Sequence, residues 1–533
     1  MRLFYKKVKE KTESSIDPSY VIWNPDSTHK NPVFSSTMEE YLTNWAKYLE
    51  TKFSQPKITT STHTPNIHTS EAQDGPITNS EVDHAIQKLK NHKAAGVDEI
   101  TYEDVKLVNK LKPGLVRNIL QECWQNERSP ENFHKSLLHL FQKPAHPGSR
   151  RDYRFQKNHR PISLLVTMRK VYEIILSKRI LSHVSLSHTQ FGFQPGKSTT
   201  DCIFLLIEAI QECRYIVRGR KGGKHQKLYC AFLDIEGAFD DVPRDRIWAK
   251  MSKRYGIRGR LLRVTIDLFS NCCGKAILNG QLTREFPINN GVIQGSVLGP
   301  TLFLLFIDDL LVKLKASNLG VPMGLFMLTD LTYADDVTLM SLTKDELQTL
   351  LNICTDWALN NGMRWGFDKC FAVVFNSLSK KQDDLPKLSL GEPNNKIHYL
   401  ACYYPEDTKE LYLGFNLTDC FTRTKLNTGI LPHSLVPNHR SKPNRKYLKL
   451  IKTKFNRTRH GIQRLCPDKS ILTPYISIRM YKSLQRSTLL YGMEFCEWDP
   501  DQIEDLEIMQ AKALRSHLDA DLHCPKSILR LSS

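Results

Sequence analysis

The chain has 533 residues, of which 40% are hydrophobic and 25% charged, and this composition excludes a mainly disordered, collagen-like or coiled-coil protein. The length allows a large core or several domains. Seventy-five Lys and Arg residues against 56 Asp and Glu residues leave a net charge of +19, which attracts polyanions, most often nucleic acid and sometimes an anionic membrane.

Neither membrane insertion nor secretion is indicated. The strongest apolar run, 301–307, ends at Asp308 and Asp309, far short of the ~20 residues that a spanning helix needs. The first residues contain no apolar segment of a secretory signal. The 13 cysteines include no Cys-x-x-Cys pair, which argues against a zinc ribbon or a disulfide framework and favours a reducing compartment. We therefore expect an intracellular protein, nuclear or cytoplasmic, that is not secreted and has no membrane partner.

Two helices are predicted near the start of the chain. Residues 1–77 carry clusters of Asn, Pro, Ser and Thr around one helical stretch, 38–53, so we interpret them as a linker with a docking helix. The next helix is predicted to begin after Thr78, because Thr78-x-x-Glu81 is a capping box.

The last hundred residues combine a basic segment with helices. Residues 440–464 contain ten Lys and Arg residues and no acid. From about 474 to 518, polar and apolar residues alternate with a helical period. We expect a basic connection followed by a helical region.

Acidic side chains follow two strand-like segments. An apolar run ends at Asp234 in LYCAFLDIEGAFDDVPRDRIW, and a buried carboxylate needs a partner such as a metal ion. Asp335 and Asp336 are adjacent in LTYADDVTLMS; because neighbouring side chains of a strand point to opposite faces, both can serve one site only at the tip of a hairpin. The three carboxylates together would supply the oxygen ligands that Mg²⁺ prefers. Taken alone, the Asp-Asp pair would also suit a solvated loop.

Three segments in this order resemble motifs A, B and C of the reverse transcriptases of non-LTR retrotransposons: LDIEGAFD, NNGVIQGSVLGP and YADD. Further segments are similar to the fingers motifs of that family (HKAAGVDEI, NHRPISLL and QFGFQPGKSTTD), to motif D (NGMRWGFDKC), to motif E (LYLGF), and to the helical thumb and the region after the thumb (YKSLQRSTLLYGMEF and LEIMQAKALRSHL). The resemblance covers roughly 78–530, and the ordered set is far more specific than any single motif.

The resemblance implies an α+β chain with the right-hand polymerase fold. Its parts would be fingers, a palm with an antiparallel sheet that has helices on one face, and a helical thumb. Residues 78–430 would then form the fingers and palm, and residues 431–533 would form the basic connection and the helical thumb or C-terminal region.

The resemblance also implies roles for the acidic residues and for one aromatic ring. Asp234, Asp335 and Asp336 would be catalytic and would bind two Mg²⁺ ions, for which Mn²⁺ is a possible substitute. Phe239 matches the position whose ring lies under the incoming sugar and excludes a 2′ hydroxyl; the alternative is a phenylalanine of the core.

Five further residues match nucleotide-binding positions of the family. Lys143 and Arg160 match cationic fingers positions that meet the triphosphate. Gln294 and Gly295 match the residues that let the backbone approach the nascent base pair. Lys369 falls where motif D carries a lysine thought to protonate the departing pyrophosphate, although an exposed lysine is the alternative.

The implied function is RNA-directed DNA synthesis, in which an RNA template is copied from the 3′ end of a DNA primer with deoxynucleoside triphosphates. A catalytically decayed or repurposed RNA-binding protein on the same fold is the alternative, and the oligomeric state stays open. The nucleic acid is expected to contact lysines of the basic segment, namely Lys446, Lys449, Lys452 and Lys454.

The chain departs from the family pattern at a few positions. Ala95 replaces a usual proline, Glu99 replaces a usual glycine, and Phe367-Asp368 replaces the usual approach to Lys369. No segment resembles the endonuclease that such elements normally encode, so the sequence is expected to lack that domain and to be a fragment or a truncated copy.

Overall fold

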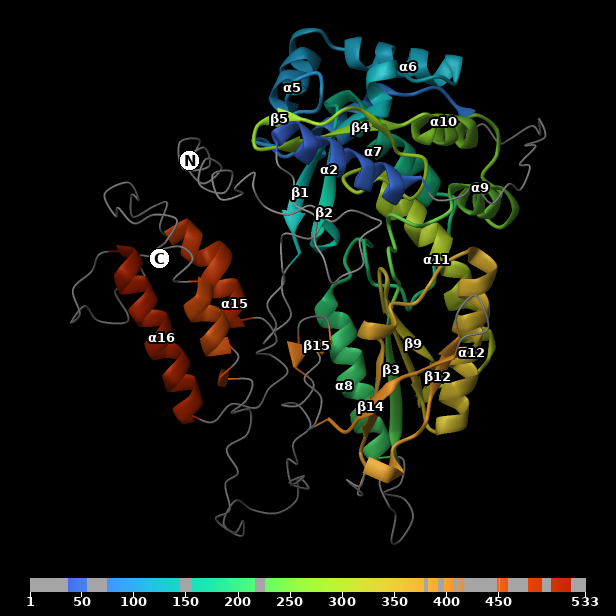
Figure 1. Ribbon diagram of the computed structural model, residues 1–533, viewed down its shortest axis with the longest axis vertical. Coiled ribbons are helices and arrows are strands. Elements are labelled where there is room, and N and C mark those ends of the chain that lie inside the picture. The colour runs from blue at the N-terminus through green and yellow to red at the C-terminus, as the bar shows by residue number, and fades with distance from the viewer. Residues whose placement is uncertain are drawn as a thin grey trace.

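The computed structural model describes residues 37–54, 74–143, 156–215, 226–377, 382–391, 397–405, 411–412, 415–416, 448–449, 451–458, 478–490 and 500–518. Figure 1 shows two sheets, each with its own helices, and C-terminal helices beside them.

The first sheet has the order β2-β1-β4-β5, with β6 paired to β4. Strands β1 and β4 are parallel, whereas β1 and β2 are antiparallel. Its strands are β1 (Lys135–Gln142), β2 (His159–Leu165), β4 (Cys273–Leu278), β5 (Gln281–Leu282) and β6 (Phe286–Pro287). The helices around it are α2 (Met38–Phe53), α4 (Asn79–Lys88), α5 (Tyr102–Leu111), α6 (Leu115–Asn126), α7 (Thr167–Leu181) and α10 (Gly259–Phe269).

The second sheet has the order β14-β11-β3-β10-β9 and lies below the first in Figure 1. All its pairs are antiparallel except the edge pair β11–β14, which is parallel. Its strands are β3 (Leu228–Asp234), β9 (Asp330–Tyr333), β10 (Asp336–Ser341), β11 (Phe371–Phe375) and β14 (Ala401–Tyr403). Long helices connect or flank these strands, namely α8 (Thr199–Tyr215), α9 (Arg244–Lys253), α11 (Leu298–Ala316) and α12 (Lys344–Asn361).

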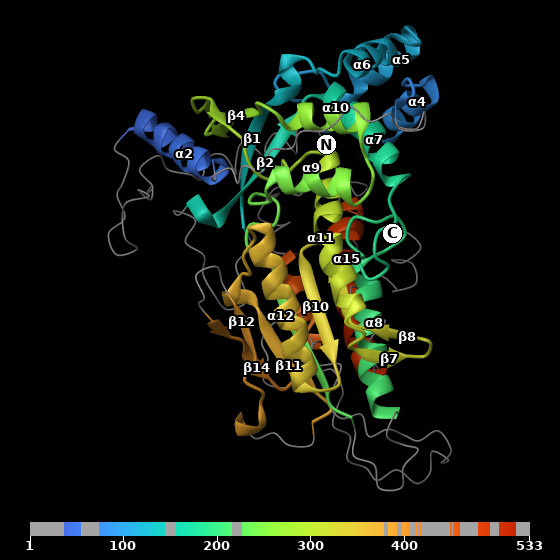
Figure 2. The ribbon, with the colours of Figure 1, turned by 90° about the vertical axis from the view of Figure 1, so that its right-hand side faces the viewer.

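Helices cover both faces of the second sheet, not one face as the resemblance implied. Leu233 packs in one core with α11 and α12, whereas Phe232 packs in a second core with α8. Figures 1 and 2 place α8 and α12 on opposite sides of this sheet. The physical reason is that β11 consists entirely of apolar residues, all of them buried, so each face of the sheet must be covered.

The structure confirms the two helices predicted near the start. Helix α2 buries Tyr41 and Trp45, as their helical spacing indicates. Thr78 caps α4, and its backbone N–H donates to the Glu81 carboxylate at 2.9 Å, which completes the capping box.

The described C-terminal residues are helical. The elements are the helical residues 451–458, the π-helical turn η7 (Tyr481–Arg486), α15 (Ser487–Leu490) and α16 (Pro500–Leu518). His517 and Gln485 are hydrogen-bonded at 2.8 Å, which joins α16 to η7. The expected helical tail is therefore confirmed over residues 478–490 and 500–518.

The remaining elements are short. They are η1 (Glu131–His134), η2 (Gln156–Asn158), η3 (Phe367–Lys369), η4 (Gln382–Asp384), β7 (Val321–Met323), β8 (Phe326–Leu328), β12 (Ser389–Gly391), β13 (Ile397–Tyr399), β15 (Leu411–Tyr412) and β16 (Phe415–Asn416). Among the described residues, no helix has the length and apolar character needed to cross a membrane.

Candidate active site

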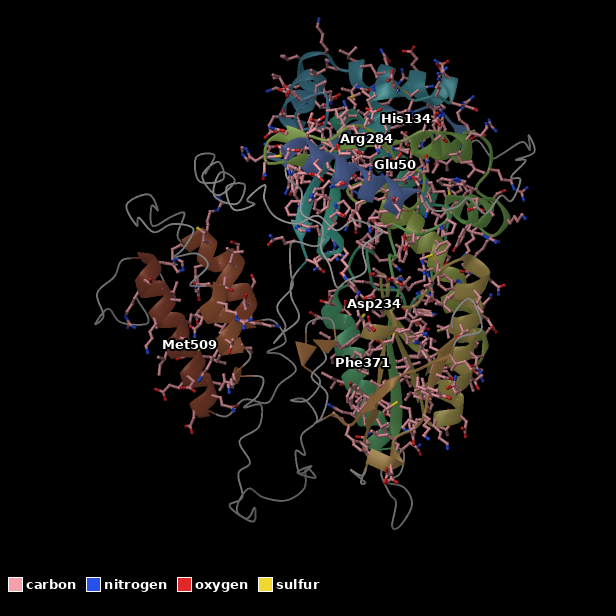
Figure 3. All side chains as sticks on the ribbon, viewed as in Figure 1. Glu50, His134, Asp234, Arg284, Phe371 and Met509 are labelled. Atoms are coloured by element: carbon pink, nitrogen blue, oxygen red, sulfur yellow. The ribbon has the colours of Figure 1, made fainter. Side chains whose placement is uncertain are left out.

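The second sheet brings the two acidic segments together at one end. In the antiparallel pair β3–β10, Asp336 lies directly opposite Asp234. Figure 3 labels Asp234 at the end of β3 that faces the first sheet. Residues more than 100 positions apart in the sequence therefore share one site because strand register aligns them.

Asp335 lies in the tip of a hairpin, as the sequence predicts. Tyr333 of β9 pairs with Asp336 of β10, so the loop between them consists of Ala334 and Asp335 alone. Ala334 has a φ of +59°, the positive value that tight two-residue hairpin loops require and that alanine seldom adopts. The turn thus allows two adjacent aspartates to belong to one site.

Burial disfavours the charged forms of Asp335 and Asp336. The pKa of the Asp336 carboxyl is raised to about 7 by desolvation and by the charges of Asp335 and Asp234. Desolvation also raises the pKa of Asp335, and Asp234 adds to the effect, while Lys369 and Arg160 oppose it. The carboxylates are therefore in need of a positive partner.

Lys369 supplies part of that positive charge. Its Nζ atom lies 2.7 Å from Oδ2 of Asp234. The Gly366 N–H donates to the backbone carbonyl of Asp234 at 2.8 Å, and a Cβ at Gly366 would lie 3.0 Å from Asp234 Oδ2. The segment before β11 is thereby held close against the end of β3, and Lys369 reaches Asp234 from it.

The acidic residues fit a divalent cation by charge and donor type. In the described part of the chain, no three His, Cys, Asp or Glu side chains are grouped as a ready metal cluster. Asp234, Asp335 and Asp336 nevertheless act on one another electrostatically, and their oxygens are the ligands that Mg²⁺ prefers. A cation bound among them would offset the repulsion that raises the pKa of Asp336.

Phe239 is half-buried between two other rings. It stacks on Phe303 of α11 with ring centroids 5.1 Å apart, and Phe193 meets it edge-on at 5.9 Å. Phe193 is 51% exposed. Phe239 therefore packs against the core through Phe303, and its role under the incoming sugar stays a prediction.

The loop that contains Gln294 and Gly295 packs against strand β2. The backbone carbonyl of Gln294 accepts from the Ser163 N–H at 2.7 Å. Gly295 has a φ of +116°, and a Cβ there would lie 2.2 Å from the Ser163 carbonyl oxygen. Only glycine satisfies both the backbone angle and this close approach.

A buried carboxylate fixes the helix that follows this loop. Oε2 of Glu173 accepts from the backbone N–H groups of Val297 and Leu298 at the start of α11, while its Oε1 pairs with Arg169 at 2.8 Å. Sequence reasoning missed this role; the signal was an acid and a base at i, i+4 in the apolar centre of helix α7, where Arg169 and Glu173 are fully buried.

The two cationic residues expected near the triphosphate lie in the first sheet. Arg160 is exposed on β2, opposite Phe141 of β1, and its charge acts on Asp335. Lys143 follows β1, and its N–H donates to the Asn158 carbonyl at 2.9 Å. The charge of Arg160 therefore acts on the acidic site from the first sheet.

The basic residues expected to contact nucleic acid differ among themselves. Lys449 is exposed, and burial lowers the pKa of Lys454. Lys452 forms an ion pair with Asp505 of α16 at 2.6 Å, so its charge is already partnered within the chain. Lys446 lies outside the described residues.

The part of the chain that carries this site matches a known protein family. Residues 143–417 match the family model described as reverse transcriptase (RNA-dependent DNA polymerase). The chain is 24% identical over 519 residues to the RNA-directed DNA polymerase from mobile element jockey of Drosophila melanogaster, covering 92% of this chain and 49% of that protein.

Two other relatives are of the same kind. The probable RNA-directed DNA polymerase from transposon X-element of Drosophila melanogaster is 27% identical over 390 residues, which are 69% of this chain and 39% of that protein. The Pol polyprotein from the type-2 retrotransposable element R2DM of the same organism is 28% identical over 229 residues, which are 42% and 20% of the two chains.

The chain spans about half the length, or less, of these curated relatives. The family model matches more than half of the chain and includes all three aspartates of the site. The chain therefore belongs to the reverse transcriptase (RNA-dependent DNA polymerase) family.

Proposed function

We propose that the protein is an RNA-directed DNA polymerase of a non-LTR retrotransposon, which extends the 3′ end of a DNA primer on an RNA template with deoxynucleoside triphosphates. The observation that carries the proposal is the register of β3 with β10, which sets Asp336 opposite Asp234 with Asp335 in the adjoining tip. Family membership and relatives named RNA-directed DNA polymerase support it.

The proposal includes a right-hand architecture. The second sheet would be the palm, since it carries the aspartates, and the first sheet with its helices would be the fingers. Residues 78–430 would contain both, with a linker and docking helix in 1–77. Residues 431–533 would then form the basic connection and the thumb.

Two Mg²⁺ ions, or Mn²⁺ in their place, would be held by Asp234, Asp335 and Asp336. When bound, such ions supply Lewis acidity to the primer hydroxyl and the triphosphate. The protein's own contribution is to hold three carboxylates in a partly desolvated site whose charge repulsion favours cation binding.

Other residues would orient the nucleotide. Arg160, and Lys143 with it, would bind the triphosphate from the fingers. Phe239, held by its stacking on Phe303, would form the floor under the sugar. Gln294 and Gly295 would lie along the nascent base pair, in a loop that the close approach of Gly295 to Ser163 holds against β2.

Lys369 would act on the departing pyrophosphate as a proton donor. Its ammonium group lies on Asp234 at 2.7 Å in the present arrangement and is half-exposed. It would therefore have to leave that carboxylate oxygen when a cation binds there, which makes the ammonium group available to another anion.

The experiment is primer extension on an RNA template with purified protein and Mg²⁺. Wild-type protein should extend the primer, and Asp335→Asn should abolish synthesis while leaving RNA binding within a few fold, because a lost ligand charge does not alter the basic surface. Asp345→Asn, an exposed aspartate in the first turn of α12, is the matched control and should retain activity.

Two results would contradict the proposal. Wild-type-like incorporation by Asp335→Asn would overturn the assignment of the site. Tight RNA binding by the wild-type protein without any extension would favour the alternative of an RNA-binding protein on the same fold.

A further inference from the structure

A buried glutamine is hydrogen-bonded to the tip of the hairpin that carries Asp335. Oε1 of Gln190 accepts from the Ala334 N–H at 2.8 Å, and its Nε2 donates to the Ala334 carbonyl at 3.2 Å. The same Oε1 also accepts from the Gly192 N–H at 2.8 Å. Gln190 is 2% exposed, and it lies 144 positions before Ala334 in the sequence.

These contacts constrain the peptide that precedes Asp335. The Ala334 carbonyl belongs to the peptide plane between Ala334 and Asp335, so holding the N–H and the carbonyl of Ala334 from one amide limits how that plane can rotate. Its orientation sets the backbone of Asp335 and hence the direction of the carboxylate. The positive φ of Ala334 makes such support necessary, because alanine prefers other conformations.

The segment around Gln190 is itself fixed beside the hairpin. The Phe191 N–H donates to the Thr332 carbonyl at 2.7 Å, and the Thr332 N–H donates to the Thr189 carbonyl at 2.9 Å. Gly192 lies so close to the tip that a Cβ there would be 2.3 Å from the Ala334 nitrogen. The glutamine therefore approaches Ala334 from a segment that is hydrogen-bonded along β9.

We propose that Gln190 is a positioning residue that holds the Ala334–Asp335 peptide and thereby directs Asp335 in the polymerase site. The inference rests on the proposed function for its effect on rate, but the contact itself can be tested without activity. Glutamine suits the task because its amide presents an acceptor to the N–H and a donor to the carbonyl at the same time.

Three variants of the full chain separate these contributions. Gln190→Met keeps the length and removes every polar contact, and Gln190→Glu keeps an acceptor but loses the donor. Gln194→Met is the matched control, because the Gln194 amide donates to the Gln190 backbone carbonyl at 2.9 Å in the same segment. Gln190→Glu keeps the test valid if Gln190→Met fails to fold.

The first measurement is hydrogen–deuterium exchange of a peptide that spans 330–338. We expect faster exchange in Gln190→Met than in wild type or Gln194→Met, with unchanged exchange in α6, which lies far from the hairpin in the sequence and belongs to the other sheet. Gln190→Glu should also show faster exchange, because an oxygen replaces the Nε2 donor that faces the Ala334 carbonyl. Unchanged hairpin exchange in both Gln190 variants would show that the Gln190 amide does not restrain the hairpin tip, whether or not the protein polymerises.

The second measurement is single-turnover nucleotide addition. We expect Gln190→Met to lower the rate constant between about 10-fold and about 100-fold, as small misplacements of reacting groups do, while the dissociation constants of nucleotide and primer–template stay within a few fold. Gln190→Glu should also lower the rate constant, and Gln194→Met should match wild type. Faster hairpin exchange with an unchanged rate constant would overturn the positioning role. An inactive wild-type protein would overturn the proposed function, but the restraint of the hairpin tip by Gln190 would still stand on the exchange data.

Discussion

The Nζ atom of Lys369 lies 2.7 Å from Oδ2 of Asp234, so an ammonium group is paired with the carboxylate that ends β3. The lysine side chain is 52% exposed and that of Asp234 is 21% exposed. A divalent cation at the aspartates would compete with this ammonium group for the same oxygen. The ion pair would thus couple metal binding to the position of Lys369.

Lys369→Met is expected to lower the Mg²⁺ concentration that gives half-maximal primer extension, because the competing ammonium group is gone. A solvent-exposed ion pair contributes ~0.2–1 kcal/mol, so the concentration should fall by up to about fivefold. The maximal rate should fall as well if Lys369 protonates the pyrophosphate. Titration of Mg²⁺ measures both, and Lys344→Met on α12 is the control; a higher Mg²⁺ requirement would contradict the competition.

Phe239→Val is expected to raise the incorporation of ribonucleotides relative to deoxyribonucleotides, because a smaller side chain leaves room for a 2′ hydroxyl. The ratio of kcat/KM for the two nucleotides measures it. Phe303→Leu, which alters the ring under Phe239, is the control for lost packing. An unchanged ratio in Phe239→Val with lowered stability would make Phe239 a residue of the core alone.

Local patterns predict the hairpin that carries Asp335, because a tight turn depends on short-range rules; the pairing of Asp336 with Asp234 depends instead on strand register between distant segments. A two-residue turn after a strand is enough to expect that Asp335 and Asp336 share a tip, and β9–β10 has that turn. The capping box at Thr78 is likewise contained within four residues. In both cases the interacting groups are close in the sequence.

Contacts between distant segments could not be predicted in the same way. Nothing near Gln190 indicates that its amide meets Ala334, and nothing near Lys452 indicates that Asp505 neutralises it. The helices on both faces of the second sheet left a readable signal, the unbroken apolar run of β11, but the resemblance to the family implied helices on one face. Side-chain partners across the fold depend on tertiary packing, which periodicity does not encode.

Lys449 and Lys452 are expected to contribute unequally to RNA binding. Lys449→Gln should weaken binding to all sequences alike and reduce the salt slope by about 0.7, the value for one contact to a single-strand phosphate. Lys452→Gln should have a smaller effect, because Lys452 is paired with Asp505. Fluorescence anisotropy with labelled RNA over a range of salt concentrations measures the slopes.

The same ion pair provides a reciprocal test. Asp505→Asn should free the Lys452 ammonium group and strengthen RNA binding, with no preference among sequences. A loss of affinity in Asp505→Asn, or an effect limited to one template sequence, would contradict a phosphate-binding role.

Asp241 is expected to make the protein less stable as the pH rises. Burial raises the pKa of its carboxyl to about 6, with Asp240 and Glu236 adding to the effect and Lys52 opposing it. Because this pKa is above the unfolded value of about 3.9, the folded state binds more protons between these two values and loses stability as the pH rises through them. The melting temperature of Asp241→Asn should therefore exceed that of wild type by on the order of 1–2 °C at pH 7, and by less at pH 4.

Asp240→Asn is the matched control for this change. Asp240 pairs with Lys52 at 2.8 Å, so its loss should lower the melting temperature at pH 7. Thermal melts of the three proteins from pH 4 to pH 8 give the differences directly. A stabilisation by Asp241→Asn that does not change with pH would exclude titration of this carboxyl as the cause.

Glu99→Gly is expected to stabilise the protein by about 0.5–1 kcal/mol. Glu99 is exposed and has a φ of +58°, which is a left-handed conformation. This conformation costs a non-glycine residue more free energy than the greater loss of chain entropy costs a glycine on folding.

Glu127 provides the control, because it has a φ of +53° as well but its carboxylate pairs with Arg263 at 2.5 Å. Glu127→Gly should therefore destabilise, since the loss of the ion pair outweighs the relief of the backbone. Denaturant unfolding of both variants measures the two free energies; a destabilised Glu99→Gly would mean that the Glu99 side chain contributes more than its backbone conformation costs.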